Sequence, residues 1–159
     1  MRLLILAVGR MKSGPEAELA ARYLDRVRKA GKSVGMAGVE VRELAESGAA
    51  RSADRKAEEA EALKKHIGSS PFVALDESGK NLNSEDFAAI VGGRADAGEA
   101  SLAFVIGGPD GLDPAFRDQA AATIAFGKMT WPHKMARLML AEQLYRAVTI
   151  LSGHPYHRA

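Results

Sequence analysis

Short apolar runs alternate along the chain with longer stretches in which apolar residues recur every three or four positions. The short runs are typical of strands buried in a parallel sheet, and the recurring positions are typical of amphipathic helices. The pattern predicts strands over residues 2–8, 38–44, 72–75, 101–106 and 122–126. It predicts helices over residues 15–30, 54–67, 114–120 and 133–151, and another that starts near Asn83 and carries Phe87, Ile90 and Val91.

Strands separated by helix-length segments predict an α/β fold with one open, mostly parallel sheet of about five strands flanked by helices. No repeat, low-complexity tract or linker interrupts the sequence, so we expect a single domain over residues 1–159. Ligands of such sheets bind beyond the carboxyl ends of the strands. Loops that follow three strands, at Leu75-Asp76, 107–111 and 126–132, would converge there if the strands are neighbours.

Composition places the chain among globular proteins, with 47% hydrophobic and 26% charged residues. The absence of cysteine excludes disulfides, thiolate catalysis and cysteine zinc sites, and the cytoplasm is the expected location. No apolar run reaches the roughly 20 residues that cross a bilayer, so no membrane is expected. The run after Arg2 has two interpretations, a signal peptide or a first buried strand, and its shortness favours the strand.

Charge is distributed unevenly although the net charge is only +2. From Lys128 onward, five Lys or Arg residues stand against one acid, Glu142, and three histidines add to them. This basic end could meet a phosphate backbone, or it could be an ordinary solvated face.

Two loops are candidates for ligand binding. The sequence GGPDG at 107–111 is neither a dinucleotide fingerprint nor a P-loop, and it predicts either a tight turn or a close approach of a ligand to the main chain. The loop 126–133 has apolar neighbours and no acidic partner, which suits an uncharged ring such as adenine. A plain connection from strand to helix is the alternative for that loop.

The helix over 133–151 has apolar residues on more than one side, so it is either wholly buried or shared with a partner chain. Glu142 and Arg146 are four residues apart on it, a spacing more typical of a local salt bridge than of a catalytic pair.

The end of the chain, residues 152–159, is unusually rich in titratable groups for a terminus. A metal site is not expected, because no carboxylate is near and a proline separates the histidines. Acid-base catalysis, phosphate contact or stacking on a base fits this composition better, and a tail packed on its own subunit is the alternative. The candidate residues are His154, Tyr156, His157 and Arg158.

The ordered set of motifs resembles a known family. The segments are FVIGGPDGL, MTWPHKMARLMLAEQLYRA and GHPYHR, with LLILAVGR and ALDESGK before them. Together they are similar, over the whole chain, to the ribosomal RNA large subunit methyltransferase H family, small members of the trefoil-knotted SPOUT methyltransferases. The resemblance implies an S-adenosylmethionine-dependent enzyme that methylates N3 of a pseudouridine in 23S rRNA on the assembled ribosome. It also implies a homodimer and a C-terminal trefoil knot.

The same resemblance implies a set of cofactor-binding residues. The family commonly has Ser where Gly127 stands, so a main-chain contact is expected at that position. The implied cofactor-binding residues are Leu75, Gly107, Phe126, Gly127, Lys128, Met129, Thr130 and Trp131.

For catalysis, we hypothesise that His154, Tyr156, His157 and Arg158 stabilise the N3 anion, with His157 a candidate base. The tail would reach the pocket of the partner subunit, positioned by Glu142 and Arg146. A SPOUT methyltransferase acting on tRNA and a non-catalytic RNA-binding dimer are the alternatives.

Overall fold

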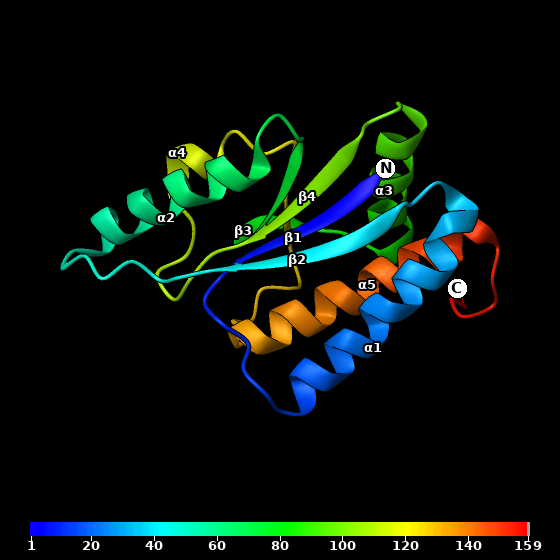
Figure 1. The fold of residues 1–159 in the computed structure, drawn as a ribbon, viewed down its shortest axis with the longest axis horizontal. Helices are drawn as coiled ribbons and strands as arrows, with labels where there is room; N and C mark the ends of the chain where they lie inside the picture. The colour runs from blue at the N-terminus through cyan, green and yellow to red at the C-terminus, as the bar shows by residue number, and fades with distance from the viewer. Residues whose placement is uncertain (159) are drawn as a thin grey trace.

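The computed structural model describes residues 1–158 and contains one five-stranded sheet in which every pair of neighbouring strands is parallel (Figure 1). The strand order is β2-β1-β4-β3-β5. Ala159, the last residue of the predicted domain, lies outside the described residues. The elements are β1 (Arg2–Val8), α1 (Pro15–Ala30), the 3-10 helix η1 (Gly31–Val34), β2 (Gly38–Leu44), α2 (Ser52–Ile67), β3 (Phe72–Asn81), α3 (Ser84–Asp96), β4 (Ser101–Ile106), α4 (Pro114–Arg117), β5 (Ala122–Ala125) and α5 (His133–Ser152).

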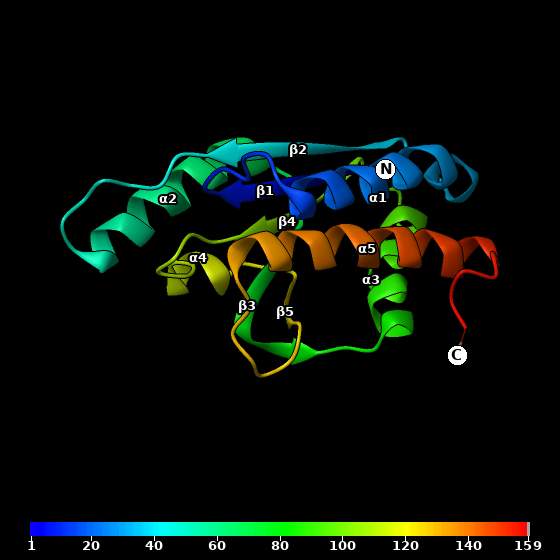
Figure 2. The ribbon, with the colours of Figure 1, turned by 90° about the horizontal axis from the view of Figure 1, so that it is seen from below.

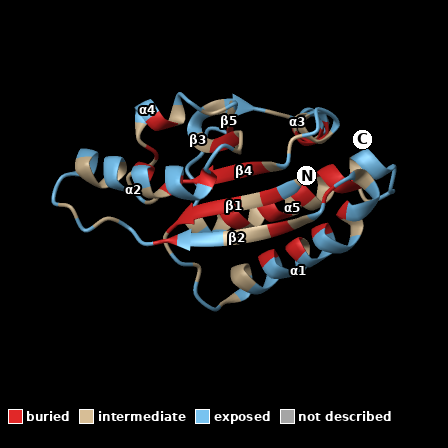
Figure 3. Cartoon of the chain, turned by 45° about the horizontal axis from the view of Figure 1, so that its top comes forward, coloured by how far each residue is buried: buried red, intermediate tan, exposed pale blue. Residues whose placement is uncertain are grey.

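Helices cover both faces of the sheet (Figures 1 and 2). Side chains of a strand alternate between faces, so Leu102 and Phe104 of β4 join one core and Ala103 and Val105 join the other. The first core is closed by α1, α3 and α5, and the second by α2 and α4. Figure 3 shows the buried residues along the central strands and on the sheet-facing sides of the helices. The predicted α/β class with a parallel sheet is confirmed.

Five predicted elements have different ends in the structure, and in two of them, β5 and α5, the last residue differs by one position. Helix α2 starts two residues earlier, at Ser52, and α4 ends at Arg117 instead of 120. Strand β3 continues to Asn81 and not only to Leu75. The extension escapes the sequence pattern because residues 76–79 form an irregularity, after which Lys80 pairs with Ile124 of β5. The strand conformation of Lys80 and Asn81 depends on their pairing with β5 and not on their own residue types, so the sequence pattern does not predict it.

Gly79 allows this extension to pass β5. A Cβ atom there would lie 2.5–2.7 Å from the backbone atoms of Ile124, which cannot move without disturbing the sheet. Gly79→Ala is expected to lower the free energy of unfolding by about 1–3 kcal/mol, as overpacking does. Urea denaturation measures this.

Gly93→Ala is the matched control for Gly79→Ala, because Gly93 lies within α3 and a Cβ there has nothing within 4 Å. This substitution is expected to leave stability unchanged or to raise it by up to about 1 kcal/mol, since alanine is the better helix former. Equal effects of the two substitutions would refute the role assigned to Gly79.

Helix α5 packs between α1 and α3 of its own chain, and its buried residues include Arg137, Leu140, Leu144 and Val148. Much of its multi-sided apolar surface is therefore covered within one subunit, while Leu151 remains 36% exposed.

Among residues 1–158, no helix combines the length and apolar character needed to span a membrane. The trefoil knot stays a prediction.

Candidate active site

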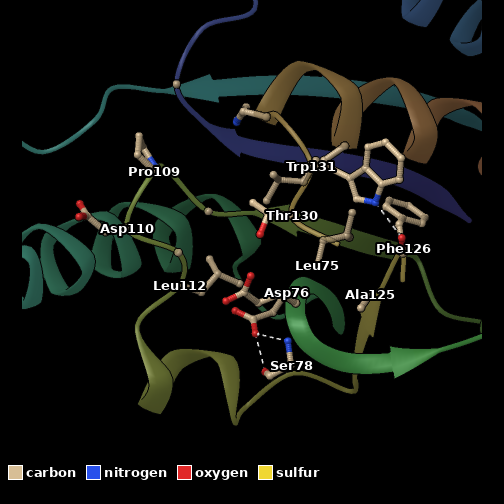
Figure 4. A pocket seen from close by; sticks show the side chains of 18 of the residues that line it. Leu75, Asp76, Ser78, Pro109, Asp110, Leu112, Ala125, Phe126, Thr130 and Trp131 are labelled. Atoms are coloured by element: carbon tan, nitrogen blue, oxygen red, sulfur yellow. Dashed lines mark hydrogen bonds between the residues drawn. The ribbon is translucent and has the colours of Figure 1, made fainter. Parts of the chain in front are cut away.

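A cavity of about 760 Å³ lies at the carboxyl ends of the strands (Figure 4). The three loops predicted to converge do so, because β4, β3 and β5 are neighbours in the sheet. Leu75 and Asp76, the whole of 107–111, and most of 126–131 line the cavity. Gly9 and Arg10 after β1, Glu46 after β2 and His133 at the start of α5 complete its wall on the other side.

Seven of the eight residues implied as cofactor-binding line this cavity, and Lys128 is exposed and does not. The seven are Leu75, Gly107, Phe126, Gly127, Met129, Thr130 and Trp131. The structure therefore brings together residues from three separate strand ends. Their contact with a cofactor stays a prediction.

Two hydrogen bonds between side chains and the main chain hold the loop 126–131. The Trp131 indole Nε1 donates to the Phe126 carbonyl at 2.8 Å, and Gly127 N donates to Asn81 Oδ1 at 3.1 Å. Gly127 has φ of 95°, in the left-handed region that favours glycine. Two large side chains of this loop remain uncovered: Met129 is 76% exposed and Trp131 is 42% exposed. Both can therefore contact a ligand or a second chain.

The GGPDG loop is a tight turn, as one of its two interpretations predicts, and it borders the cavity. The close approach of a ligand to its main chain stays a prediction. Gly111 N donates to Gly108 O at 2.9 Å, which closes the turn. Asp110 is joined to Arg55 of α2 by two contacts of 2.7 and 2.9 Å, and the hydrogen bonds from Arg55 lower the pKa of Asp110. Arg55 also donates to the carbonyls of Ala49 and Ala50, so it ties two loops to one helix. No motif or spacing in the sequence predicts this link between residues 55 positions apart.

His133 is a cavity residue that the sequence reasoning did not propose as functional. Burial lowers its pKa, and the neighbouring Arg137 guanidinium lowers it further, so the ring is neutral at pH 7. Arg137 itself is 7% exposed and pairs with Glu43 Oε2 at 2.6 Å, which joins α5 to the end of β2. This pair fixes the start of α5 beside the cavity.

The tail residues gather elsewhere, in a group that we call the C-terminal cluster: Tyr23, Glu85, Glu142, Arg146, Tyr156 and His157. The Tyr156 hydroxyl donates to Glu142 at 3.1 Å, and the Arg146 guanidinium lies 4.9 Å from the centre of the Tyr156 ring. Burial, together with hydrogen bonds to Tyr23 and Glu142, raises the pKa of Tyr156. The predicted positioning pair, Glu142 and Arg146, is present at 2.5 Å.

Both ring nitrogens of His157 are engaged in this cluster. Nδ1 lies 3.2 Å from Arg146 Nη1, and Nε2 lies 2.7 Å from Glu85 Oε1. Because Arg146 can only donate, Nδ1 is the acceptor and Nε2 carries the proton. His157 must therefore leave Arg146 before it can take a proton from a substrate. His154 and Arg158, in contrast, are exposed.

One chain does not bring the C-terminal cluster to its own cavity. The cavity borders the first turn of α5, as far as Ala136, and the cluster lies along the second half of the helix, from Glu142 onward. Ala136 and Glu142 are six residues apart, about 9 Å along the helix axis. Figure 2 shows the C-terminus beyond the α3 side of α5, away from the loop that enters the helix. The tail packs on its own subunit, which was the alternative interpretation. Its action in a partner's cavity remains a prediction.

Comparison with known proteins shows the family to which this chain is related. A family model described as "Predicted SPOUT methyltransferase" matches residues 1–157. "Ribosomal RNA large subunit methyltransferase H" of Allorhizobium ampelinum is 57% identical over 160 aligned positions, which cover 100% of both chains. The chain belongs to the ribosomal RNA large subunit methyltransferase H family of SPOUT methyltransferases. The member of this family from Rhizobium meliloti (strain 1021) is 56% identical, again over 100% of both chains.

Two solved structures share the fold of this family member at low sequence identity. A probable methyltransferase from Bordetella pertussis Tohama I has a TM-score of 0.51 and 13% identity, over 92% of this chain and 95% of that one. A probable methylase family protein from Haemophilus influenzae Rd KW20 has a TM-score of 0.52 and 11% identity, over 99% and 70%. The predicted SPOUT type of fold is confirmed.

Proposed function

We propose that this ribosomal RNA large subunit methyltransferase H family member transfers a methyl group from S-adenosylmethionine to N3 of a pseudouridine in 23S rRNA. We place the reaction on the assembled ribosome, in the cytoplasm, and assign it to a homodimer without a metal. Family membership supports the reaction class, and curated relatives are named as methyltransferases of the ribosomal RNA large subunit. Within residues 1–158, no cluster of three or more acidic or histidine side chains forms a metal site.

The observation that carries the proposal is the single cavity shared by seven of the eight implied cofactor residues. Its volume lies within the range of small-molecule sites, roughly 300–1,000 Å³. Leu75, Ile106 and Ile124 give it apolar walls, and the 126–131 loop offers main-chain polar groups. An adenine ring is recognised by this combination of apolar faces and backbone donors and acceptors. The cavity residues therefore fit the proposed cofactor.

When bound, S-adenosylmethionine supplies a methyl group on a sulfonium, which the deprotonated N3 takes by direct displacement as the carbon–sulfur bond breaks. The residues of the cavity hold the acceptor and the methyl group in line, which provides much of the rate. Arg158 and His154, exposed at the end of the tail, stabilise the N3 anion in this scheme. His157 is the candidate base once it has left Arg146.

The homodimer accounts for the separation between cavity and tail. A second subunit placed with its α5 antiparallel to the first would bring the end of one α5 to the start of the other. Exposed Met129 and Trp131 at the cavity, and half-exposed Leu151 at the other end of α5, are available for such an interface. Sedimentation analysis tests the dimer directly.

The decisive experiment is a methyl-transfer assay with assembled ribosomes, isolated large subunits and free rRNA, combined with calorimetry of S-adenosylmethionine binding. We expect calorimetry to show a heat of S-adenosylmethionine binding and the assay to show methyl transfer to ribosomes. Primer extension should map the methylated product to one pseudouridine. Transfer to tRNA instead would assign the chain to the tRNA alternative. If calorimetry shows no heat of S-adenosylmethionine binding, the non-catalytic RNA-binding dimer is the remaining alternative.

A further inference from the structure

Asp76 stands where the sheet opens into the cavity. Its predecessor Leu75 is the last residue of β3 that pairs with β4, opposite Ile106, and the pairing of β3 with β5 is interrupted until Lys80. The Asp76 side chain is 13% exposed and lines the cavity. Figure 4 shows it among the labelled cavity residues, next to Leu75 and Ser78. A carboxylate at this depth requires partners for both of its oxygens.

The hydrogen bonds that the described residues make to the Asp76 carboxylate all go to one of its two oxygens. Oδ1 accepts from Ser78 N at 3.0 Å and from Ser78 Oγ, and Arg117 Nη1 lies 3.5 Å away. Oδ2 accepts no hydrogen bond from any residue between 1 and 158. Burial alone would raise the pKa of Asp76, but the hydrogen bonds from Ser78 and the charge of Arg117 lower it, so the group is ionised at neutral pH. Ser78 and Arg117 thus hold the ionised Asp76 carboxylate in place through Oδ1, and Oδ2 remains available to a ligand.

The chemistry of the free oxygen defines its ligand. An ionised carboxylate oxygen only accepts hydrogen bonds, so its partner must be a donor. The wall that holds the adenine includes Leu75, the residue before Asp76, and the ribose is the part of the cofactor attached directly to the adenine. The ribose carries two vicinal hydroxyl donors. Acidic side chains serve the same purpose in dinucleotide-binding folds.

We propose that Asp76 is a cofactor-binding residue whose Oδ2 accepts a hydrogen bond from the ribose hydroxyls of S-adenosylmethionine, an assignment that rests on the proposed function. Arg117 and Ser78 are positioning residues that orient the carboxylate. Asp76 follows a strand end that the sequence predicts to border the ligand site, whereas the sequence suggests neither Ser78 nor Arg117 as a site residue. The 41 positions between Asp76 and Arg117 separate groups that only the fold brings together.

Calorimetry of Asp76→Asn with three ligands tests this assignment. S-adenosylmethionine, S-adenosylhomocysteine, which lacks the sulfonium charge, and methylthioadenosine, which lacks the amino acid, all carry the same ribose. Each Kd is expected to rise by about tenfold or more, the loss typical of a hydrogen bond to a charged group. A rise for S-adenosylmethionine alone would assign Asp76 to the sulfonium, and a rise for S-adenosylmethionine and S-adenosylhomocysteine with unchanged methylthioadenosine binding would assign it to the ammonium. Either result overturns the ribose assignment.

Asp118→Asn is the matched control, because Asp118 is an exposed carboxylate that lies 3.6 Å from the same Arg117 and does not line the cavity. Its three Kd values should equal those of the unmodified protein. Thermal unfolding of both variants shows whether the fold is kept. If the unmodified protein binds none of the ligands, the proposed function fails; if it binds all three and Asp76→Asn binds them equally well, only the role of Asp76 fails.

Discussion

Deleting residues 154–159 is expected to abolish methyl transfer to ribosomes and to leave cofactor affinity unchanged within about twofold, because the two sites do not touch. The rate should fall by at least about 100-fold, since the deletion removes the proposed base and the groups that stabilise the anion. Cofactor binding survives because the cavity borders the start of α5, while the tail is anchored on Glu142 in the middle of α5 and on Glu85 of α3, neither of which lines the cavity. Radiolabelled methyl transfer and calorimetry on the same preparation measure both quantities.

Tyr156→Phe is the milder companion of this deletion. It removes the hydroxyl that contacts Glu142 and Tyr23 and keeps the ring beside Tyr145 and Arg146. If Tyr156 positions the tail, this variant should keep part of the activity. A truncated protein that methylates ribosomes at the normal rate would eliminate the tail from the mechanism.

Mixed dimers can locate the cavity in which the tail acts. A truncated subunit has an intact cavity and no tail, and a subunit carrying Gly107→Ala has a tail and an altered cavity. If the tail serves the partner, a dimer of the two contains one complete site and recovers activity. If the tail serves its own subunit, neither half of the mixed dimer is complete and the mixture stays inactive.

The fold could be read from the sequence wherever burial controls the residue types. Runs such as 2–8 and 101–106 are continuous apolar strands between helices, and their positions agree with the structure. The second half of β3 could not be read in this way, because Asp76 to Lys80 are polar or glycine residues. Their conformation is decided by β5, which lies close enough to exclude a Cβ at Gly79.

The sequence also predicts part of the candidate site, namely the place of the cavity but not the residues that support its loops. Loops that follow neighbouring strands must meet at one edge of a parallel sheet, so the cavity could be anticipated from strand ends. The supporting residues could not. In the sequence, Arg55 and Glu85 look like ordinary helix-surface residues, and Tyr23 looks like part of the apolar face of its helix. They gain a role only because Asp110, Tyr156 and His157 come to them from distant parts of the chain.

Gly107→Ala is expected to remove most cofactor binding together with methyl transfer. A Cβ at this position would lie 2.8 Å from the Gly111 carbonyl carbon, 3.0 Å from its oxygen and 3.0 Å from Leu112 N. These are main-chain atoms of the turn that borders the cavity, so the turn itself must move. A displacement of about 1 Å in a site can cost about 100-fold in rate, and we expect a loss of that order in kcat/KM.

The cofactor Kd of Gly107→Ala should rise by at least about tenfold, since the shifted turn would no longer match the cofactor that we propose for this cavity. Gly48→Ala is the control: Gly48 is also a loop glycine, but a Cβ there meets nothing within 4 Å. Wild-type affinity in Gly107→Ala would mean that the turn is not part of the cofactor site. Loss of binding here and its retention in the tail deletion would together show that cofactor binding depends on the cavity and not on the tail, as the proposed division between the two predicts.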